Sequence, residues 1–359
     1  MKSAVISLES TSSKMVAEAM KKYFEQVDMI HLKSIEVDLG KEGGIFYNGK
    51  ELEKYDCIYL KGSFRYANLL RSIATLLEGK ISYMPLPADS FTTVHNKLLT
   101  HLTLQQHHLP MPKTYVSPDV EGAKNLLKKI HYPIVMKFPE GTQGKGVMFA
   151  DSISSASSML DALGVLKQPF IIQEYVETDG TDIRALVVGE KVVAAMKRKA
   201  QTEEKRANIH AGGIGEPVQL SRAVINVALD TAKALNVDIC GVDILEGPSG
   251  PLVIEANISP GLQGLSAVST IDIANEIARY LHYRTQKVLE GTKKEETKTV
   301  MKEIMPDEYT THQIITGLQF RGERILLPDI VTRFTKFNDR KEYTLTLKRG
   351  KLEIEESKK

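Results

Sequence analysis

The stretch Val135-Met-Lys-Phe-Pro-Glu-Gly-Thr-Gln-Gly-Lys-Gly-Val147 is the part of the chain that best indicates its fold. An apolar strand enters a loop with three glycines, Gly141, Gly144 and Gly146, and a second apolar strand leaves it. Glycine lets a backbone approach a polyanion closely, and successive N–H groups in such a loop can bind phosphate oxygens. We therefore predict a β-hairpin whose tip binds phosphates; a hairpin loop without a ligand is the alternative.

Two common phosphate-binding loops do not fit this segment. A Walker loop requires Ser or Thr after its Gly-Lys pair, whereas Lys145 is followed by Gly146. A dinucleotide fingerprint requires another glycine spacing and a helix after the loop, whereas a strand follows here. Lys137, at the end of the first strand, and Lys97, further upstream, are candidate phosphate ligands because a lysine carries a compact charge on a long stem. A solvated surface lysine is the alternative for each.

The segment Ile171-Ile-Gln-Glu-Tyr-Val176 is a candidate binding site for adenine. It is an apolar strand that ends in polar residues, and its backbone would offer donors and acceptors to the edge of the base. Asp182 begins the next predicted strand and would suit a ribose hydroxyl. Ordinary strand termination is the alternative, because many strands end in polar residues.

Two predicted strands, 239–245 and 252–257, carry polar residues within apolar runs. Glu255 and Asn257 are two residues apart on a strand and therefore point to the same face. The turn between the strands can bring Asp243 to this face, and carboxylate and amide oxygens are the ligands that Mg²⁺ prefers. We predict a metal site here; salt bridges from the carboxylates to Arg or Lys are the alternative.

Basic residues lie between these segments, at Arg198 and in Arg206-Ala-Asn-Ile-His210. Arginine binds carboxylates and phosphates through paired hydrogen bonds, so Arg198, Arg206 and Asn208 are candidate ligands of a substrate acid or an acyl-phosphate. We expect a structural or orienting role for His210.

The length and the hydrophobic pattern indicate several lobes, because a single core rarely grows past roughly 250–300 residues and the chain has 359. Strands alternate with helices near the N-terminus, which predicts a small, parallel, doubly wound α/β lobe. The predicted divisions are an N-terminal α/β domain (1–95), a larger domain (96–286) whose part from about 112 to 175 carries the glycine loop, a charged linker (287–309) and a small β-rich module (310–359). We expect the last helix before the linker to end near Arg284.

Composition excludes several classes of protein. With 42% hydrophobic and 26% charged residues the chain is neither disordered nor collagen-like, and a net charge of +2 gives no reason to expect a nucleic-acid partner. Cys57 and Cys240 lie in apolar runs and are expected to be buried thiols. No apolar run reaches the roughly 18 residues of a membrane span, and none at the start suits a signal peptide, so we expect a cytoplasmic protein without a membrane partner.

In this order, these segments resemble the ATP-grasp superfamily and, more closely, its RimK-type branch, which adds L-glutamate or a similar amino acid to a carboxylate. The resemblance covers roughly residues 95–285. The matching phrases are Val135-Met-Lys137, Glu140-Gly-Thr-Gln-Gly144, Gln173-Glu-Tyr175, Asp182-Ile-Arg184, Val192-Val-Ala-Ala195, Arg206-Ala-Asn-Ile-His210, Gly212-Gly213, Gly241-Val-Asp-Ile-Leu245, Glu255-Ala-Asn257 and Ser259-Pro-Gly261. It implies an α/β ATP-grasp fold with an N-terminal pre-ATP-grasp lobe and two ATP-grasp subdomains.

The resemblance also implies three sets of site residues. ATP would be bound by Lys97, Lys137, Glu140, Gly141, Thr142, Gln143, Gly144, Gly146, Gln173, Glu174, Tyr175, Val176, Asp182 and Arg184. Mg²⁺, or Mn²⁺, would be bound by Asp243, Glu255 and Asn257. The substrates or the transferred phosphate would be bound by Arg198, Arg206, Asn208, His210, Gly212, Gly213, Ser259 and Gly261, the first three as catalytic residues. The family has His-Arg-Gly-Gly where this chain has His210-Ala-Gly-Gly213, which leaves the added amino acid and the acceptor open.

The implied activity is that of an ATP-dependent carboxylate–amine ligase. A substrate carboxylate attacks the γ-phosphate, an amine attacks the resulting acyl-phosphate, and ADP and phosphate are released. No catalytic Ser or Cys is expected. The expected partners are ATP, a carboxylate acceptor (a small molecule or a peptide or protein terminus) and an amino acid, L-glutamate first.

The C-terminal segments Phe320-Arg-Gly-Glu-Arg-Ile-Leu-Leu-Pro-Asp-Ile-Val331 and Tyr343-Thr-Leu-Thr-Leu-Lys-Arg-Gly-Lys-Leu-Glu-Ile354 resemble the AbrB/MazE swapped-hairpin barrel, with Asn338-Asp-Arg340 replacing the usual Gly-Asp turn. This resemblance implies a homo-oligomer formed through residues 310–359, and several such modules bind DNA. A small β appendage packed on the ligase is one alternative. Another alternative, for the whole chain, is a nucleotide-sensing regulatory protein whose tail binds DNA.

Overall fold

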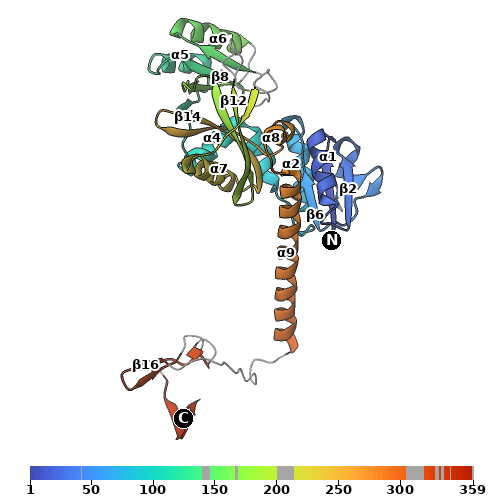
Figure 1. The fold of residues 1–359 in the computed structure, drawn as a ribbon, viewed down its shortest axis with the longest axis vertical. Helices are drawn as coiled ribbons and strands as arrows, with labels where there is room; N and C mark the ends of the chain where they lie inside the picture. Colours follow the sequence, from blue (N-terminus) through green and yellow to red (C-terminus); the bar gives the residue numbers. More distant parts are fainter. Residues whose placement is uncertain are drawn as a thin grey trace. The chain divides into compact units, whose positions relative to one another are not determined.

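The computed structural model describes residues 1–41, 43–139, 146–165, 169–199, 214–304, 319–327, 331–332, 335–339 and 341–357. It divides into two compact units, Met1–Glu295 and Glu296–Lys359, and each is described by itself. The predicted α/β class is confirmed, because the first unit combines several sheets with helices that cover them (Figure 1).

The N-terminal lobe contains one parallel and one antiparallel sheet. Its elements are β1 (Lys2–Ser7), α1 (Thr11–Met20), β2 (Gln26–His31), η1 (Leu32–Ser34), β3 (Ile35–Asp38), β4 (Gly44–Tyr47), β5 (Lys50–Glu51), β6 (Cys57–Leu60), η2 (Phe64–Tyr66), α2 (Ala67–Leu77) and α3 (Ala88–His95). The parallel sheet has the order β2-β1-β6, and its central strand is buried on both faces, as the apolar run predicted. The antiparallel sheet β3-β4-β5 was not predicted.

A second lobe carries the strands on either side of the glycine loop. Its elements are β7 (Thr114–Tyr115), α5 (Val120–Leu127), β8 (Ile134–Lys137), β9 (Val147–Ala150), α6 (Ile153–Val165) and β10 (Ile171–Glu174). The antiparallel sheet has the order β7-β10-β8-β9, and α5 and α6 cover it (Figure 1). Leu127, Ile134 and Leu160 belong to a hydrophobic core that is separate from the main one. This lobe is therefore packed around its own interior.

The central sheet is antiparallel and has five strands in the order β13-β12-β11-β14-β15. The elements of this part are α4 (Lys97–Gln106), β11 (Thr181–Val188), β12 (Lys191–Lys199), β13 (Ile214–Pro217), α7 (Arg222–Ala234), β14 (Ile239–Gly247), β15 (Gly250–Asn257) and α8 (Gln263–Val268). The amphipathic helix α7 packs on the sheet through Val224, Ala228 and Ala232. Cys57 and Cys240 are buried free thiols, as predicted.

Helix α9 (Ile273–Ile304) is longer than predicted. We expected it to end near Arg284 and a charged linker to follow, but the helix includes most of that segment. The physical reason is that Lys and Glu are good helix formers, and the first proline after the helix start is Pro306, just beyond its end. Among the described residues, no helix is both long and apolar enough to cross a membrane.

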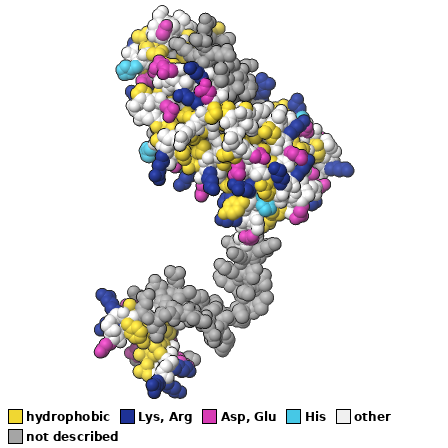
Figure 2. Space-filling view, in the orientation of Figure 1, with side chains coloured by type: hydrophobic (Ala, Val, Ile, Leu, Met, Phe, Trp, Pro, Cys, Tyr) yellow, Lys and Arg dark blue, Asp and Glu magenta, His cyan; other side chains and the backbone are white. Residues whose placement is uncertain are grey.

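The described part of the second unit contains two β-hairpins, β16 (Gln319–Arg321) with β17 (Arg324–Leu326) and β18 (Tyr343–Lys348) with β19 (Lys351–Glu356). The tight turn predicted at Arg349-Gly350 is present, and Gly350 has a φ of 78°, which favours glycine. Hydrophobic side chains gather on the exposed surface of these hairpins (Figure 2). They include Phe320, Ile325, Leu345, Leu347 and Leu352.

Candidate active site

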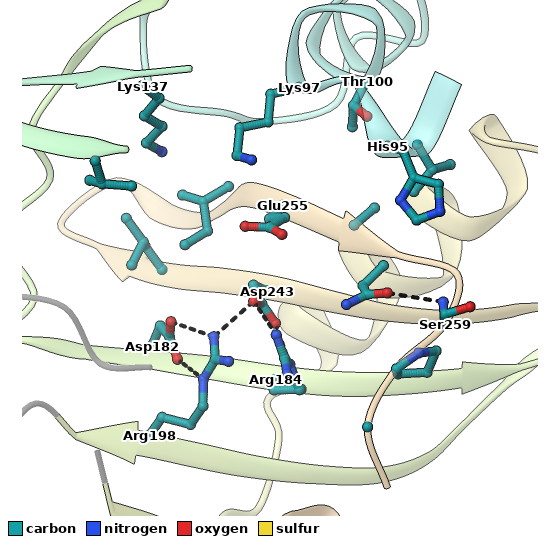
Figure 3. Close-up of a pocket in the computed structure, with 18 of the residues that line it drawn as sticks. His95, Lys97, Thr100, Lys137, Asp182, Arg184, Arg198, Asp243, Glu255 and Ser259 are labelled. Atoms are coloured by element: carbon teal, nitrogen blue, oxygen red, sulfur yellow. Dashed lines mark hydrogen bonds and ion pairs between the residues drawn. The ribbon is translucent and has the colours of Figure 1, made fainter. Parts of the chain in front are cut away.

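A cavity of about 600 Å³ in the first unit is lined by residues from the N-terminal lobe, the glycine-loop lobe and the central sheet. Lys97 and Lys137 lie on one side of it, and Glu255 and Asp243 lie opposite (Figure 3). Positive charges that suit phosphates therefore face carboxylates that suit a cation. Most of the predicted site residues that the structure describes line this one cavity.

Asp243 and Glu255 are register partners on the neighbouring strands β14 and β15. A β-bulge between Asp243 and Ile244 creates this pairing, because the register from Ile244 onward would otherwise place Asp243 opposite Ile254. The Glu255 carboxylate points into the cavity (Figure 3) and has no hydrogen bond or ion pair among the described residues. It is therefore an anionic group that acts on Lys137 through its charge alone and leaves its oxygens available to a ligand.

Two arginines surround Asp243. Arg184 donates to Oδ1 and Oδ2 of Asp243 over 2.7 and 2.6 Å, and Arg198 approaches Oδ2 at 2.8 Å. Burial alone would raise the pKa of Asp243, but the two arginines outweigh it and hold this pKa at about 2. Salt bridges to arginine were the alternative to a metal site. Asp243 forms such salt bridges, whereas Glu255 forms none among the described residues.

Asp182, which we expected to bind ribose, forms an ion pair with Arg198. Both of its oxygens accept hydrogen bonds of 2.6 Å from Nε and Nη2 of Arg198, and both residues are buried. Asp182 and Arg198 are register partners on β11 and β12, which explains the pairing. The Asp182 carboxylate therefore orients Arg198, and each of its oxygens can still accept one further hydrogen bond.

Lys137 is held by the side chain of Gln173. Its Nζ donates a 2.6 Å hydrogen bond to Oε1, and Nε2 of the same amide donates to Thr114 Oγ1 at 2.9 Å and contacts His101 Nε2 at 3.1 Å. His101 Nδ1 lies 2.6 Å from the Lys97 carbonyl oxygen and must donate to it, so Nε2 accepts from Gln173. Burial lowers the pKa of His101 to about 4, which keeps the ring neutral.

This network connects both candidate phosphate ligands. Lys97 is the first residue of α4, which begins because the Asn96 side chain caps it by accepting from Leu98 N and Leu99 N. His101 lies one helical turn further on, so the ring and the backbone of Lys97 are fixed together. We did not predict a role for His101, although its i+4 spacing from a candidate ligand was a signal.

In the predicted adenine segment, some backbone N–H groups are already used in hydrogen bonds within the protein. The N–H groups of Glu174 and Tyr175 donate to the carbonyls of Lys113 and Pro133, over 3.0 and 3.1 Å. Glu174 also accepts a 2.8 Å hydrogen bond from Tyr115 Oη. Tyr175 and Val176 line the cavity, so the hydrogen bonds to a base would come from the end of this segment.

Gly146 is the only one of the three loop glycines that lies within the described residues. Its φ is 76°, and a Cβ there would come within 2.2 Å of the Phe138 ring, so this position requires glycine. Ten expected site residues lie outside the described residues, in segments 140–145 and 200–213: Glu140, Gly141, Thr142, Gln143, Gly144, Arg206, Asn208, His210, Gly212 and Gly213.

Ser259 and Gly261 line the cavity close to the N-terminal lobe. The Ser259 hydroxyl accepts a 2.9 Å hydrogen bond from Gly62 N, and Ser259 N donates over 2.9 Å to Oδ1 of Asn257. The predicted substrate segment and the predicted metal ligand Asn257 are therefore joined. Lys61, which follows β6, also lines the cavity and was not predicted.

A sequence model of the RimK-like ATP-grasp domain matches residues 94–281. The chain is 33% identical to a "probable alpha-L-glutamate ligase" of Marinomonas sp. (strain MWYL1) over 273 residues, which is 75% of this chain and 91% of that protein. It is 34% identical to the protein of the same name in Sodalis glossinidius (strain morsitans), over 79% of this chain and 98% of that one. The ATP-grasp ligase PsnB, in complex with minimal precursor, Mg and ADP, has a similar fold, with a TM-score of 0.62, 18% identity and coverage of 79% of this chain and 98% of PsnB.

The fold and the cavity are those of an ATP-grasp enzyme. The chain belongs to the RimK-like ATP-grasp family, and it is an ATP-dependent ligase that forms C–N bonds.

Proposed function

We propose that this ligase uses ATP and Mg²⁺ to activate a substrate carboxylate as an acyl-phosphate, and then joins it to the amine of an amino acid, L-glutamate in the first instance. The observation that carries the proposal is the Glu255 carboxylate, which makes no hydrogen bond or ion pair among the described residues and faces Lys97 across the cavity that Lys137 also lines (Figure 3). The two curated relatives described above, both named as probable glutamate ligases, support the choice of amino acid.

The residues present fit a divalent cation. Glu255 has no hydrogen-bond or ion-pair partner among the described residues. Of the three arginine contacts to Asp243, Oδ1 takes only one. Because a carboxylate oxygen can accept two hydrogen bonds, Oδ1 can still bind a cation. Asn257 Oδ1 accepts one backbone hydrogen bond and can accept a second. Among the described residues there is no cluster of three His, Cys, Asp or Glu side chains, so the site would consist of two carboxylates and an amide. Mg²⁺, or Mn²⁺, would supply positive charge at the phosphate oxygens.

The lysines would bind the polyphosphate on the opposite side. Lys137 is oriented by a hydrogen bond to the neutral amide of Gln173, and the Glu255 carboxylate acts on it only through its charge, without an ion pair among the described residues. The γ-phosphoryl group would pass to an oxygen of the substrate carboxylate as the bond to ADP breaks. The amine would then attack the carbonyl carbon, forming the C–N bond and releasing phosphate. The glycine-loop lobe would exclude water from the acyl-phosphate.

The remaining assignments follow from where the side chains lie. Arg184 and Arg198 would act mainly by fixing Asp243, and a contact from Arg198 to the transferred phosphate would use Nη1, since Nε and Nη2 bind carboxylates. We retain Ser259 and Gly261 as substrate-side residues because they line the cavity. Arg206, Asn208, His210, Gly212 and Gly213 remain proposed substrate ligands from the sequence.

The acceptor would be a carboxylate on a small molecule, a peptide or a protein terminus. The complex of the ATP-grasp ligase PsnB with a minimal precursor, at 18% identity and a similar fold, is consistent with an acceptor larger than a free amino acid. The RimK-like match favours the ligase over a regulatory protein whose tail binds DNA. Steep salt-dependent binding of DNA to the full chain would support that alternative.

The hairpins of the second unit would form a contact with a second copy of the chain. A two-stranded hairpin is marginally stable by itself, and exposed Phe320, Leu345 and Leu347 would gain free energy by burial. Truncation before residue 310 should lower the molar mass measured by light scattering to that of a monomer. An unchanged mass would contradict a homo-oligomer formed through this segment.

ADP release is the assay that tests the proposed function. We would incubate the enzyme with Mg²⁺-ATP, single amino acids and candidate acceptors, and compare Glu255→Ala with the control Glu246→Ala, which changes an exposed carboxylate on β14. ADP release that depends on one amino acid and one acceptor, and is lost only in Glu255→Ala, supports the proposal. Equal turnover in Glu255→Ala would contradict it.

A further inference from the structure

Lys61 is a buried lysine without a hydrogen-bond partner. It is 3% exposed, and its Nζ contacts no acceptor among the described residues. Its Nζ lies over the face of the Tyr59 ring, 5.1 Å from the ring centroid. A buried ammonium without an anion is costly, so a position like this indicates a ligand that supplies the anion.

Among the described residues, no carboxylate compensates this charge. Burial is the only cause that lowers the pKa of Lys61, to about 8, and no neighbouring charged group contributes. At neutral pH the side chain is still mostly protonated, because the pH lies below this pKa. The cavity that Lys61 lines therefore contains a positive charge that the protein itself leaves uncompensated.

The location is the one at which an open parallel sheet binds ligands. Lys61 directly follows β6, and its N–H donates over 2.8 Å to the carbonyl of Ile6 near the end of β1. From β1 the chain passes through α1 to β2 on one side, while β6 lies on the other side. Lys61 is thus at the carboxyl ends of the strands, where the strand order reverses.

The first turn of α1 lies at the same place. Ser10, Ser12 and Ser13 line the cavity together with Lys61, and the Ser10 hydroxyl satisfies only the N–H of Ser13. The remaining N–H groups of a first helical turn have no partner within the helix, and the helix dipole favours an anion there. The helix end and the partnerless lysine are independent observations that indicate the same type of ligand.

The substrate segment adjoins this place. The N–H of Gly62 binds the Ser259 hydroxyl over 2.9 Å, and the Ser12 hydroxyl accepts from Leu262 N over 2.8 Å. In Figure 3 Ser259 lies at the opposite end of the view from Lys137. His95, drawn at the Ser259 end, also lines the cavity, and its buried Nε2 has no partner among the described residues.

We infer that Lys61 and the first turn of α1 bind a carboxylate of a substrate, one that is distinct from the carboxylate being activated. This inference rests on the proposed ligase function and extends it, since it requires one substrate to carry a second carboxylate. The second carboxylate belongs either to the incoming amino acid or to the acceptor. Lys61 is a specificity-determining residue in this account, and the nucleotide does not contact it.

The test is binding to the full chain in the presence of Mg²⁺ and a non-hydrolysable ATP analogue. The probes are L-glutamate for the amino acid and N-acetyl-glutamyl-glutamate, which has no free amine, for the acceptor. The variants are Lys61→Met, which keeps the volume and removes the charge, Lys61→Arg, which keeps the charge, and the control Lys54→Met, which changes an exposed lysine of the same lobe.

We expect Lys61→Met to raise the Kd of one probe at least tenfold and Lys61→Arg to restore part of the affinity. Lys54→Met should bind both probes like the wild type, and the Kd of ATP should be the same in all variants. The probe that is affected identifies which substrate carries the carboxylate. Three results would each overturn the inference. In the first, Lys61→Met binds both probes as tightly as the wild type. In the second, it loses as much affinity for ATP as for a probe, and in the third, neither probe binds the wild type.

Thermal unfolding separates this role from a structural one. Removal of a partnerless buried charge should raise the Tm of Lys61→Met, whereas removal of a structural contact would lower it. A lower Tm together with weaker binding would overturn the assignment. A failed ADP-release panel with intact probe binding would count against the ligase proposal and not against this subsite.

Discussion

The Lys137 ammonium donates a 2.6 Å hydrogen bond to the side-chain amide of Gln173, which is itself fixed by Thr114 and His101. An amide can orient a lysine without neutralising it, whereas a carboxylate at the same place would form an ion pair with it. The arrangement keeps a positive charge available to a phosphate in a site where burial already disfavours that charge.

Gln173→Glu should therefore weaken ATP binding although it preserves the shape of the side chain. We expect KM for ATP to rise about tenfold, which corresponds to about 1.4 kcal/mol. Gln106→Glu, at an exposed position of α4, is the control. Steady-state kinetics with varied ATP would measure the change, and an unchanged KM in Gln173→Glu would show that the amide does not act on bound ATP.

The two carboxylates should differ in what they contribute to stability. Asp243→Asn leaves Arg184 with a neutral partner in a buried site and leaves Arg198 with Asp182 alone, so we expect a loss of about 3–5 kcal/mol in the free energy of unfolding. Glu255→Gln removes a carboxylate without a partner, so stability should change little while Mg²⁺-dependent turnover falls at least 100-fold. Urea denaturation without nucleotide measures the free energy of unfolding. If Asp243→Asn and Glu255→Gln lost the same amount of it, this assignment would be contradicted.

Two buried lysines make stability and ATP binding respond oppositely to pH. Burial lowers the pKa of Lys61 and of Lys137 to about 8, whereas an unfolded lysine titrates near 10.4. Between these values the unfolded chain binds more protons, so this contribution to stability rises with pH. Protonated Lys137 attracts phosphate, so kcat/KM for ATP should fall above about pH 8. Denaturation from pH 7 to 9.5 would measure the stability, and steady-state kinetics over the same range would measure kcat/KM for ATP. If stability changed with pH equally in the wild type and in Lys61→Met, the contribution assigned to Lys61 would be contradicted.

Gly146→Ala should be more harmful than backbone strain alone predicts. Gly146 and Gly79 have nearly the same φ, 76° and 75°, but a Cβ at Gly146 meets the Phe138 ring at 2.2 Å while one at Gly79 meets nothing within 4 Å. Gly79→Ala should cost about 1–2 kcal/mol, the usual penalty for this conformation. Gly146→Ala should cost more and should also weaken ATP binding. Equal losses of unfolding free energy would mean that the Phe138 ring moves aside.

The sequence was sufficient to predict β11, β14 and β15 of the central sheet, but not β13, and the cavity-facing positions of Lys137 and Glu255, because apolar runs and the two-residue repeat of a strand determine them. It was not sufficient to predict the register. One bulge, between Leu186 and Val187, places Asp182 opposite Arg198; the register beyond the bulge would give Lys197 instead. A one-residue shift reverses which face a side chain points to, and a bulge leaves no clear sequence pattern.

Lys61 shows a different limit of sequence interpretation. A lysine after the apolar strand Cys57-Ile-Tyr-Leu60 is compatible with a surface position, and only the packing of α1 and the Ser259 segment around it shows that it is buried. Its place at the carboxyl end of a parallel strand was the available signal. Helix α9 was underestimated for the opposite reason, because a dense run of charges was interpreted as a linker although its residues favour helix.

Transfer of a carboxylate oxygen to phosphate tests the central claim most directly. The acceptor found in the ADP-release panel would be prepared with ¹⁸O in the reacting carboxylate, and the phosphate released during ligation would be analysed by mass spectrometry. Activation as an acyl-phosphate predicts one ¹⁸O atom in each phosphate, because the bridging oxygen leaves with phosphorus when the amine attacks carbon. Phosphate without ¹⁸O, formed together with the ligated product, would contradict the account.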